Sequence, residues 1–250
     1  MRRRETERPE TATVGEGDAF VEVSDLTKGY GEGDGHTQVL RGLSLSVDEG
    51  SSCVILGASG SGKSTLLNLI GGLDTADAGS IRVAGREVSA LAPRRLVDYR
   101  RELLGFVFQL YNLVPTLTVR ENVQVCANLS DDPLDLDDLL DTLGLAAHAD
   151  RFPGQLSGGQ QQRCAIGRAL VKNPRLLLCD EPTGALDSHT AHEILALLED
   201  VNRRLGTTML VVTHNEGICP MADMVVRIRD GSIVDARHNA HKVPARKLEL

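Results

Sequence analysis

The sequence has few aromatic residues and no tryptophan. Phe and Tyr together make up 3% of its 250 residues. Proteins that bind single-stranded nucleic acid stack the bases on aromatic side chains, so this composition argues against such a role. The 27 basic and 35 acidic residues give a formal net charge of −8, which provides no broad attraction to nucleic acid or anionic lipid. We therefore expect no nucleic-acid partner, and any phosphate binding must be local.

Cysteine pairs and long apolar runs are also missing. The five cysteines are scattered, without a Cys-x-x-Cys pair or a histidine at zinc spacing, and we expect them to be small buried side chains in a reducing compartment. The charged first ten residues are not followed by the apolar segment of a signal peptide, and no stretch approaches the roughly 18 apolar residues of a membrane span. We expect a cytoplasmic chain that is soluble on its own.

Four short apolar runs predict the strands of a parallel sheet that is covered on both faces. They span residues 52–56, 103–108, 176–179 and 209–213. The runs are followed, in turn, by Gly57, by Gln109, by Asp180 with Glu181, and by His214. Ligands of open α/β sheets bind just beyond the carboxyl ends of the strands. The sequence therefore predicts that these residues gather along one edge of the sheet.

The rest of the chain divides into strands, helices and tails. Residues 19–30, 40–50 and 79–88 alternate between apolar and polar, as strands with one solvated face do. The pattern from about 110 to 170 is helical, with a capping box at 118–121 and a helix that Asp132 would cap. Residues 1–19 and 236–250 are polar and unpatterned. We expect one domain over 20–235, with an N-terminal disordered tail and a C-terminal tail.

A glycine-rich turn lies between the first apolar run and a helical run. It reads GASGSGKST and fits the P-loop pattern G-x-x-x-x-G-K-[ST]. It consists of Gly57, Ala58, Ser59, Gly60, Ser61, Gly62, Lys63, Ser64 and Thr65. In a P-loop the backbone N–H groups face the β-phosphate, the lysine reaches the β- and γ-phosphates, and the serine hydroxyl ligates Mg²⁺. A flexible Gly/Ser turn is the alternative, but it would not require strand, Lys-Ser pair and helix in this order.

Two adjacent carboxylates follow the run at 176–179. An unpaired carboxylate at the mouth of a buried strand is costly unless it serves a cation. Asp180 therefore fits a Walker B residue that holds Mg²⁺, and Glu181 fits the general base for an attacking water. Two acids that cap the next helix are the alternative. Gln109 and His214 carry little weight alone, because polar residues are common at strand ends.

A second glycine turn, residues 157–159, precedes another helical run. The start of a helix leaves backbone N–H groups unpaired and carries the positive end of the helix dipole, which suits an anion. The chain thus has two candidate phosphate sites about a hundred residues apart.

Taken together, these motifs resemble those of the ABC ATPases. LSGGQ at 156–160 looks like their signature motif, and GALD at 184–187 looks like their D-loop. Tyr30 resembles the aromatic residue that stacks on adenine, Gln109 the Q-loop residue near the metal, and His214 the switch histidine.

The resemblance runs from about residue 20 to residue 236. It implies an α/β P-loop NTPase fold: a RecA-like core with an N-terminal antiparallel β layer, plus an α-helical signature subdomain. It also implies ATP and Mg²⁺ as ligands, with two subunits facing each other head to tail and each ATP held between the P-loop of one and the signature helix of the other. The resemblance assigns the γ-phosphate of the partner's ATP to residues of the signature turn: Ser157, Gly158, Gly159 and Gln160. It assigns the metal to Ser64, Gln109 and Asp180. It assigns catalysis to Lys63, Glu181 and His214.

A finer resemblance is visible in LLNLIGGLD, FVFQLYNLVPTLTVRENV and DEPTGALDS. These segments look like the subfamily of MacB-type macrolide exporters and LolD-type lipoprotein releasers, which pair with FtsX-like permeases. It implies a second copy of the chain or a paralogue, a membrane permease, and a location on the inner face of the cell membrane. An FtsEX-like regulatory ATPase that signals to a cell-wall hydrolase is the alternative. Two other classes of ATPase with the same motifs fit the sequence less well. SMC-type repair ATPases would need long heptad arms between the motifs, and ABC-F translation factors would carry two cassettes in one chain.

Overall fold

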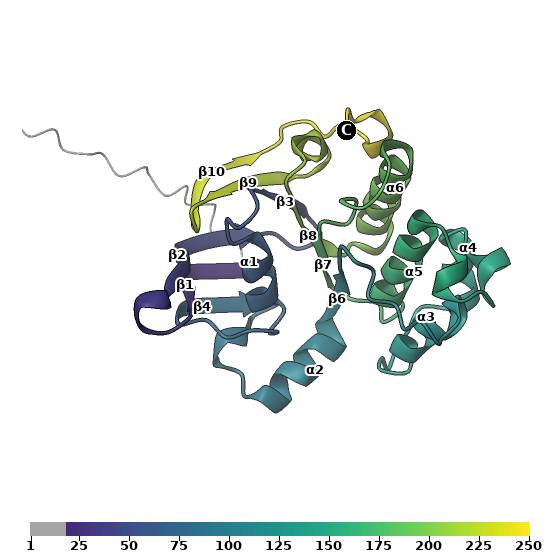
Figure 1. The fold of residues 1–250 in the computed structure, drawn as a ribbon, viewed down its shortest axis with the longest axis horizontal. Helices are drawn as coiled ribbons and strands as arrows, with labels where there is room; N and C mark the ends of the chain where they lie inside the picture. The colour runs from purple at the N-terminus through teal and green to yellow at the C-terminus, as the bar shows by residue number, and fades with distance from the viewer. Residues whose placement is uncertain (1–18) are drawn as a thin grey trace, which may run out of the picture.

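Two β-sheets and a group of helices make up the structure, a computed structural model that describes residues 19–250 (Figure 1). The first sheet is antiparallel, with strand order β2-β1-β4-β5. Its strands are β1 (Val21–Tyr30), β2 (Thr37–Val47), β4 (Ala78–Val83) and β5 (Arg86–Glu87). The predicted N-terminal tail lies, up to residue 18, outside the described residues. The three alternating segments of the sequence thus form an antiparallel layer, as predicted.

The second sheet has six strands in the order β10-β9-β3-β8-β7-β6. They are β3 (Ser52–Leu56), β6 (Leu104–Val107), β7 (Leu176–Asp180), β8 (Thr208–Thr213), β9 (Met224–Arg229) and β10 (Ser232–His238). Five of these strands, β3 and β6 to β9, are parallel to one another, and only β10 runs antiparallel, beside β9. The four predicted runs therefore lie together, and their carboxyl ends share one edge.

Both faces of this sheet are covered, which explains why its strands are continuously apolar. In β3, Cys53 and Ile55 belong to a core with helix α1 and the antiparallel sheet, whereas Val54 and Leu56 belong to a second core. Successive strand residues point to opposite faces, so every position must be apolar when both are buried. Helix α1 (Lys63–Ile70) lies between the two sheets, and α2 (Pro93–Leu103) leads into β6.

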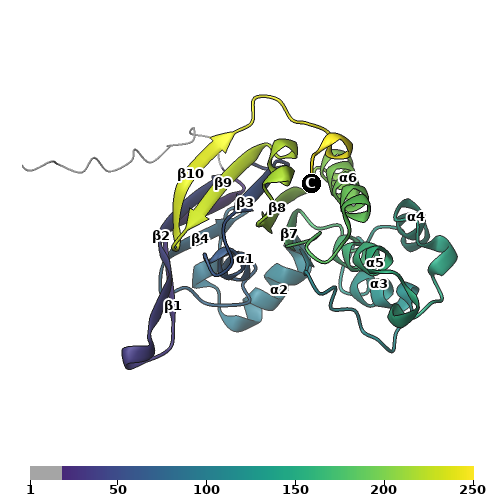
Figure 2. The same ribbon diagram turned by 45° about the horizontal axis from the view of Figure 1, so that its top comes forward.

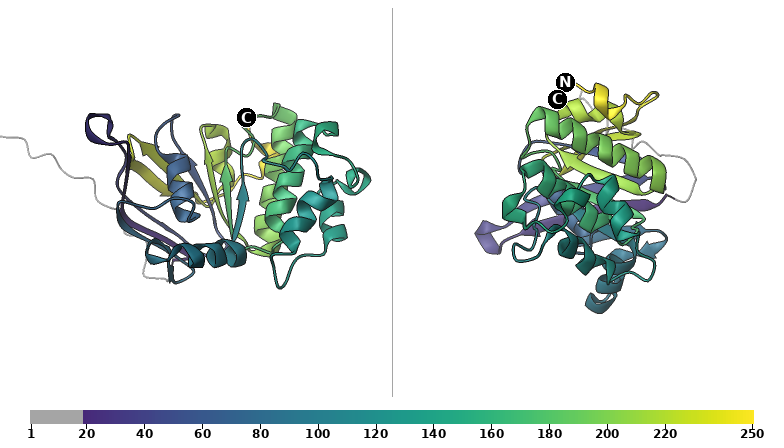
Figure 3. Two further views of the ribbon diagram at one scale, coloured as in Figure 1. Left: turned by 60° about the horizontal axis from the view of Figure 1, so that its bottom comes forward. Right: turned by 90° about the vertical axis from the view of Figure 1, so that its right-hand side faces the viewer.

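The helices on the other face form a lobe at one end of the molecule (Figure 3). They are α3 (Val119–Ala127), α4 (Leu136–Thr142), α5 (Gly158–Leu170) and, against the sheet, α6 (Ser188–Leu205). Thr118 and Glu121 form the predicted capping box of α3. The cap expected at Asp132 is wrong: Asp135 caps α4 by accepting from the backbone N–H of Asp138, because the helix starts one turn later.

The C-terminal segment is part of the folded structure. Strand β10 continues to His238, and the chain then crosses to α6 and makes a 3-10 turn at Ala245–Lys247 (Figure 2). Ala245 and Leu248 are buried against the core beneath α6. The sequence analysis assigned this segment to a tail, because its two buried residues are separated by exposed polar ones and show no regular period. Within the described residues, none of the helices is both long and apolar enough to cross a membrane.

Candidate functional site

The turn from Gly57 to Gly62 connects the end of β3 to the start of α1. Gly62 occupies the N-cap position of α1 with φ 101°, a conformation that only glycine adopts without strain. A Cβ there would also lie 2.7 Å from a methyl carbon of Leu40 in the antiparallel sheet. The turn can therefore curl closely over the helix start only because this position is glycine.

Lys63, the first residue of α1, lies over this turn. Its ammonium group donates hydrogen bonds to the carbonyl oxygens of Gly57, at 2.7 Å, and Ala58, at 2.9 Å. The residue is 7% exposed, so its charge is held inside the turn and does not extend into solvent. The lysine thus lies where a phosphate cradled by the turn would meet it.

Ser64 and Asp180 bring two oxygen ligands together from distant parts of the sequence. The Ser64 hydroxyl donates to Oδ1 of Asp180 over 3.0 Å. Burial raises the pKa of Asp180; the Ser64 hydrogen bond and Lys63 oppose this rise, and the neighbouring Glu181 adds to it. Hydroxyl and carboxylate oxygens are the ligands that Mg²⁺ prefers, so the pair fits a magnesium ion that also contacts phosphate. Gln109, at the end of β6, is exposed, and its amide nitrogen would lie 3.2 Å from a Cβ placed on Gly184.

Glu181 is held by its backbone and its side chain. Its φ is 47°, a left-handed conformation that is costly for a residue with a side chain. Its N–H donates to the carbonyl oxygen of Val212. Its carboxylate accepts from Thr213 Oγ1 at 3.1 Å and lies 2.9 Å from Nδ1 of His214. The structure thus joins Glu181 and His214, which the sequence placed on different strands, and adds Thr213, which the sequence analysis did not single out.

Tyr30 lies at the end of β1 and is 44% exposed. Its hydroxyl donates to Oδ2 of Asp74 over 2.6 Å, and Asp74 also forms an ion pair of 2.9 Å with Lys28. Burial would raise the pKa of Asp74, but the hydrogen bonds from Tyr30 and Lys28 hold it below its ordinary value. The carboxylate fixes the hydroxyl, and Nζ of Lys28 lies over the ring, 4.9 Å from its centroid. Lys28 lies outside the motifs, and Asp74 ends LLNLIGGLD, a segment that carried only a family resemblance, so the sequence analysis assigned neither residue to the site.

The second glycine turn begins α5. Ser157 caps the helix: its hydroxyl accepts from the Gln160 N–H at 3.3 Å, and the Gln160 side chain accepts from the Ser157 N–H at 2.9 Å. A Cβ on Gly159 would overlap the methyl group of Thr190 in α6, so glycine is required for close packing there. Within residues 19–250, no hydrogen bond joins residues 157–160 to residues 57–65. Figure 1 shows α5 and α1 in separate parts of the molecule.

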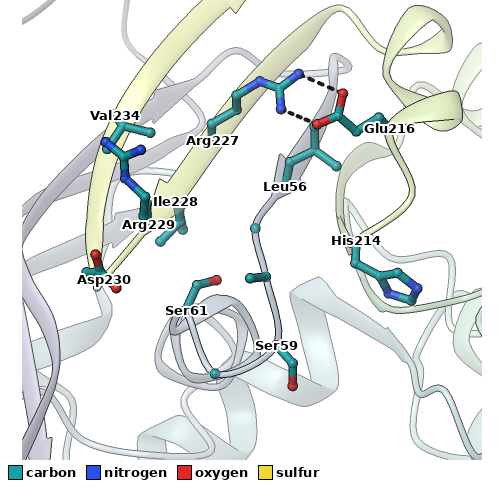
Figure 4. Close-up of a pocket in the computed structure, with 13 residues that line it drawn as sticks. Leu56, Ser59, Ser61, His214, Glu216, Arg227, Ile228, Arg229, Asp230 and Val234 are labelled. Atoms are coloured by element: carbon teal, nitrogen blue, oxygen red, sulfur yellow. Dashed lines mark hydrogen bonds and ion pairs between the residues drawn. The ribbon is translucent and has the colours of Figure 1, made fainter.

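A cavity of ≈ 410 Å³ lies beside the first turn (Figure 4). Ser59 and Ser61 line one side of it, and His214 lies on another. Arg227 on β9 donates to both carboxylate oxygens of Glu216, at 2.6 and 3.3 Å, and closes one end. Lys63, Asp180 and Glu181 do not line this cavity. The cavity is therefore lined by part of the candidate phosphate-binding turn, residues 57–61, and by His214, and it lies to one side of the Lys63 and carboxylate ligands.

A family model described as "ABC transporter" matches residues 40–184. The match spans the first glycine turn, the second glycine turn and the two carboxylates, and it covers more than half of the chain. The chain belongs to the ABC transporter family. It is an ABC-type ATPase, with the P-loop NTPase fold predicted from the sequence.

Two relatives are each 45% identical to this ABC chain over the aligned residues. One is the macrolide export ATP-binding/permease protein MacB of Shigella flexneri, over 86% of this chain and 34% of MacB. Another is the lipoprotein-releasing system ATP-binding protein LolD of Geobacter metallireducens, over 86% of this chain and 98% of LolD. The chain thus spans about a third of the MacB relative and nearly all of the LolD relative.

Solved ABC cassettes have the same fold. The dimeric structure of a post-hydrolysis state of the ATP-binding cassette MJ0796, bound to ADP and Pi, matches with a TM-score of 0.81 and 36% identity. The alignment covers 87% of this chain and 98% of that cassette. A second dimeric structure of MJ0796 matches with a TM-score of 0.80 at 37% identity, over the same shares of both chains.

Proposed function

We propose that two copies of this chain close head to tail around two ATP molecules and so drive a membrane permease of the MacB or LolD type. Each ATP would lie between the P-loop of one copy and the signature turn, residues 157–160, of the other. Hydrolysis would separate the copies, and this opening and closing would be transmitted to the permease at the inner face of the membrane.

The separation of the two phosphate-binding turns supports this proposal most directly. Each turn has the backbone of an anion site, yet they belong to different lobes and share no hydrogen bond within the described residues. A second chain turned head to tail would place the signature turn of one copy opposite the P-loop of the other. The dimeric form of the MJ0796 cassettes supports the same arrangement.

The roles proposed for the side chains follow from their positions. Lys63 and the N–H groups of residues 57–65 would hold the phosphates, and the exposed Tyr30 would stack on adenine. Ser64, Asp180 and Gln109 would hold Mg²⁺, which supplies positive charge against the β- and γ-phosphates.

Glu181 and His214 would act on the attacking water. Thr213 contacts one carboxylate oxygen of Glu181 and His214 contacts the other, and the positioned carboxylate would take the proton of the water. The side chain of His214 is 66% exposed while that of Glu181 is 14% exposed, and the imidazole would contact the γ-phosphate while Nδ1 stays beside Glu181. Catalysis would thus rest on positioning and charge.

The kind of permease is proposed from the relatives. MacB joins an ATP-binding part and a permease in one protein, and LolD is the ATP-binding protein of a lipoprotein-releasing system. We propose that the present chain works with an FtsX-like permease, as its similarity to both MacB and LolD suggests.

Mixing two inactive variants tests the shared site. Lys63→Ala removes the cation of the P-loop, and Ser157→Arg places bulk and charge where the partner's γ-phosphate would sit. Each variant alone should be inactive. In the mixed dimer, one site carries both defects and the other carries neither, so ATPase activity should reappear and rise with protein concentration. A chain that used both turns on one nucleotide would show no recovery at any ratio.

A matched mixture controls this experiment. Lys63→Ala and Glu181→Gln both damage the P-loop side of the site, so their mixed dimer contains no intact site and should stay inactive. The parent protein must first show ATPase activity without its permease. Recovery in the first mixture and not in the second is the result expected for the shared site.

A further inference from the structure

His148 contacts the signature turn, although it belongs to none of the motifs. It ends the 3-10 turn Ala146–His148, which follows α4. Its Nε2 lies 2.9 Å from Nε2 of Gln160, the last residue of LSGGQ. Gln160 in turn forms the capping box with Ser157. A side chain outside the motif therefore contacts the residue that shapes the candidate phosphate-binding turn.

The orientation of the Gln160 amide follows from its two partners. The Ser157 N–H can only donate, so the amide oxygen must face it, at 2.9 Å. The NH₂ group of the amide then faces His148 and can only donate. Nε2 of His148 must therefore accept, which requires a neutral ring with its proton on Nδ1. The reverse amide orientation would set the NH₂ group against the Ser157 N–H.

A protonated His148 is incompatible with this arrangement. Its Nε2–H would meet the NH₂ group of Gln160, and turning the amide over would remove the bond to Ser157. Nδ1 is buried and has no hydrogen-bond partner within the described residues, so the cation would gain nothing there. The imidazolium and the closed capping box thus exclude each other.

Charged groups around His148 are paired with other residues or flank it in the chain. Arg120 on α3 pairs with Asp137 on α4 at 2.6 Å, and Arg163 on α5 pairs with Glu193 at 2.8 Å. Asp150 and Arg151 follow His148 directly and are exposed. In the described structure, none of these groups forms an ion pair with His148.

We propose that His148 is a positioning residue for the signature turn, and that it acts only in its neutral form. By fixing the Gln160 amide, it keeps the Ser157 hydroxyl and the following N–H groups aimed at the ATP of the partner copy. This inference rests on the proposed shared site. Protonation of His148 would therefore weaken ATP-driven dimerisation and leave nucleotide binding by the chain's own P-loop unchanged.

Dimerisation of a slow-hydrolysing variant tests the proposal. In a Glu181→Gln background, the ATP-dependent dimer constant is measured by analytical ultracentrifugation from about pH 8 to about pH 5.5, the range in which histidine side chains change charge. Three chains are compared: the one with His148, His148→Gln, whose amide oxygen can accept at every pH, and His148→Leu, which cannot accept. ATP binding to the single chain is measured beside each.

The expected results differ between the three chains. With His148, dimerisation should weaken as the pH falls, by about two- to ten-fold, the effect of one neutral hydrogen bond. His148→Gln should match it at high pH and lose this fall, and His148→Leu should be weak throughout. The exposed His241, changed to Gln, should keep the parent profile.

Two results would overturn the proposal. One is an identical pH profile for the His148 and His148→Gln chains, and the other is parent-like dimerisation of His148→Leu. Failure of the shared site itself would appear separately, as absence of recovery in the Lys63→Ala and Ser157→Arg mixture.

Discussion

Single residues in this protein are fixed by contacts from several strands. Glu181 illustrates this: its strained backbone is hydrogen-bonded to Val212 in β8, and its carboxylate contacts Thr213, the last residue of β8, and His214, which follows that strand. The sequence identified Asp180, Glu181 and His214 as candidates because each follows a buried strand. It did not show which of them touch, because the pairing of β7 with β8 sets that contact.

The role of Glu181 can be tested by removing its basicity alone. Glu181→Gln should bind ATP with nearly the parent affinity, because glutamine has the same shape and keeps an oxygen toward Thr213. Turnover should fall by about 10²- to 10⁴-fold, since the amide cannot take a proton from water. Steady-state ATPase assays and equilibrium ATP binding measure both effects.

The variant Asp180→Asn, which changes a proposed metal ligand, provides a comparison with Glu181→Gln. It removes the charge beside Ser64 and should weaken magnesium-dependent nucleotide binding itself. Turnover of Glu181→Gln at the parent rate would refute the base assignment, and an equal loss of ATP affinity in both variants would assign Glu181 a structural role.

The secondary-structure elements show where the sequence pattern was sufficient to predict local structure. The buried strands were located to within one or two residues, because a strand covered on both faces must be apolar at every position. Helix caps were predicted where a full capping box is present, as at Thr118, and misplaced where several acids compete, as at Asp132 and Asp135. The C-terminal segment was assigned to a tail, because its contact with α6 depends on isolated residues.

The contact between α6 and the C-terminal segment should depend on pH. Nε2 and Nδ1 of His192 lie 2.8 and 2.7 Å from the carbonyl oxygens of Leu248 and Ser188, and both nitrogens can donate only in the imidazolium. These bonds raise the pKa of His192 above its ordinary value of 6.5. The stabilisation is therefore fully present below about pH 6.5 and is lost as the pH rises through the higher folded-state pKa.

Hydrogen exchange can measure this effect. Amide protection over residues 245–250 should fall between mildly acidic and alkaline pH in the parent, after correction for the intrinsic exchange rates. His192→Leu should show weak protection at both. His241→Leu, a change at an exposed histidine, should behave as the parent does, and a pH-independent parent would contradict the prediction.

At the scale of the whole molecule, exposed apolar side chains are concentrated in the segment of the chain that follows Gln109. Of the ten large apolar side chains that are exposed within the described residues, four lie between residues 110 and 129: Leu110, Val114, Val125 and Leu129. Leu110 follows Gln109 directly and is 76% exposed. Such a concentration of exposed apolar groups suits a protein partner, and we propose it as the surface that the permease contacts.

Co-purification from membranes tests this surface. The chain should co-purify with an FtsX-like permease, and Leu110→Glu should reduce the recovered complex by at least about tenfold, since it sets a charge in an apolar contact. Val234→Glu changes an equally apolar side chain, 50% exposed on β10, and should leave the complex intact. ATPase activity of the isolated chain should survive both changes.

Two results of the co-purification experiment would contradict different parts of the proposal. A chain that never co-purifies with the permease would contradict the proposed transport function. A complex that forms with Leu110→Glu would place the permease elsewhere on the chain and leave the transport proposal in place.

The sequence by itself determined the fold class and the chemistry of the candidate site. Local spacing fixes a P-loop, because glycines, lysine and serine must follow one another within a single turn, and a doubly covered strand must be apolar throughout. The tertiary structure decided which residues meet: Ser64 with Asp180, Glu181 with Thr213 and His214, Tyr30 with Asp74, and Gln160 with His148. These contacts join residues that strand order and helix packing bring together, and no pattern along the chain records that order.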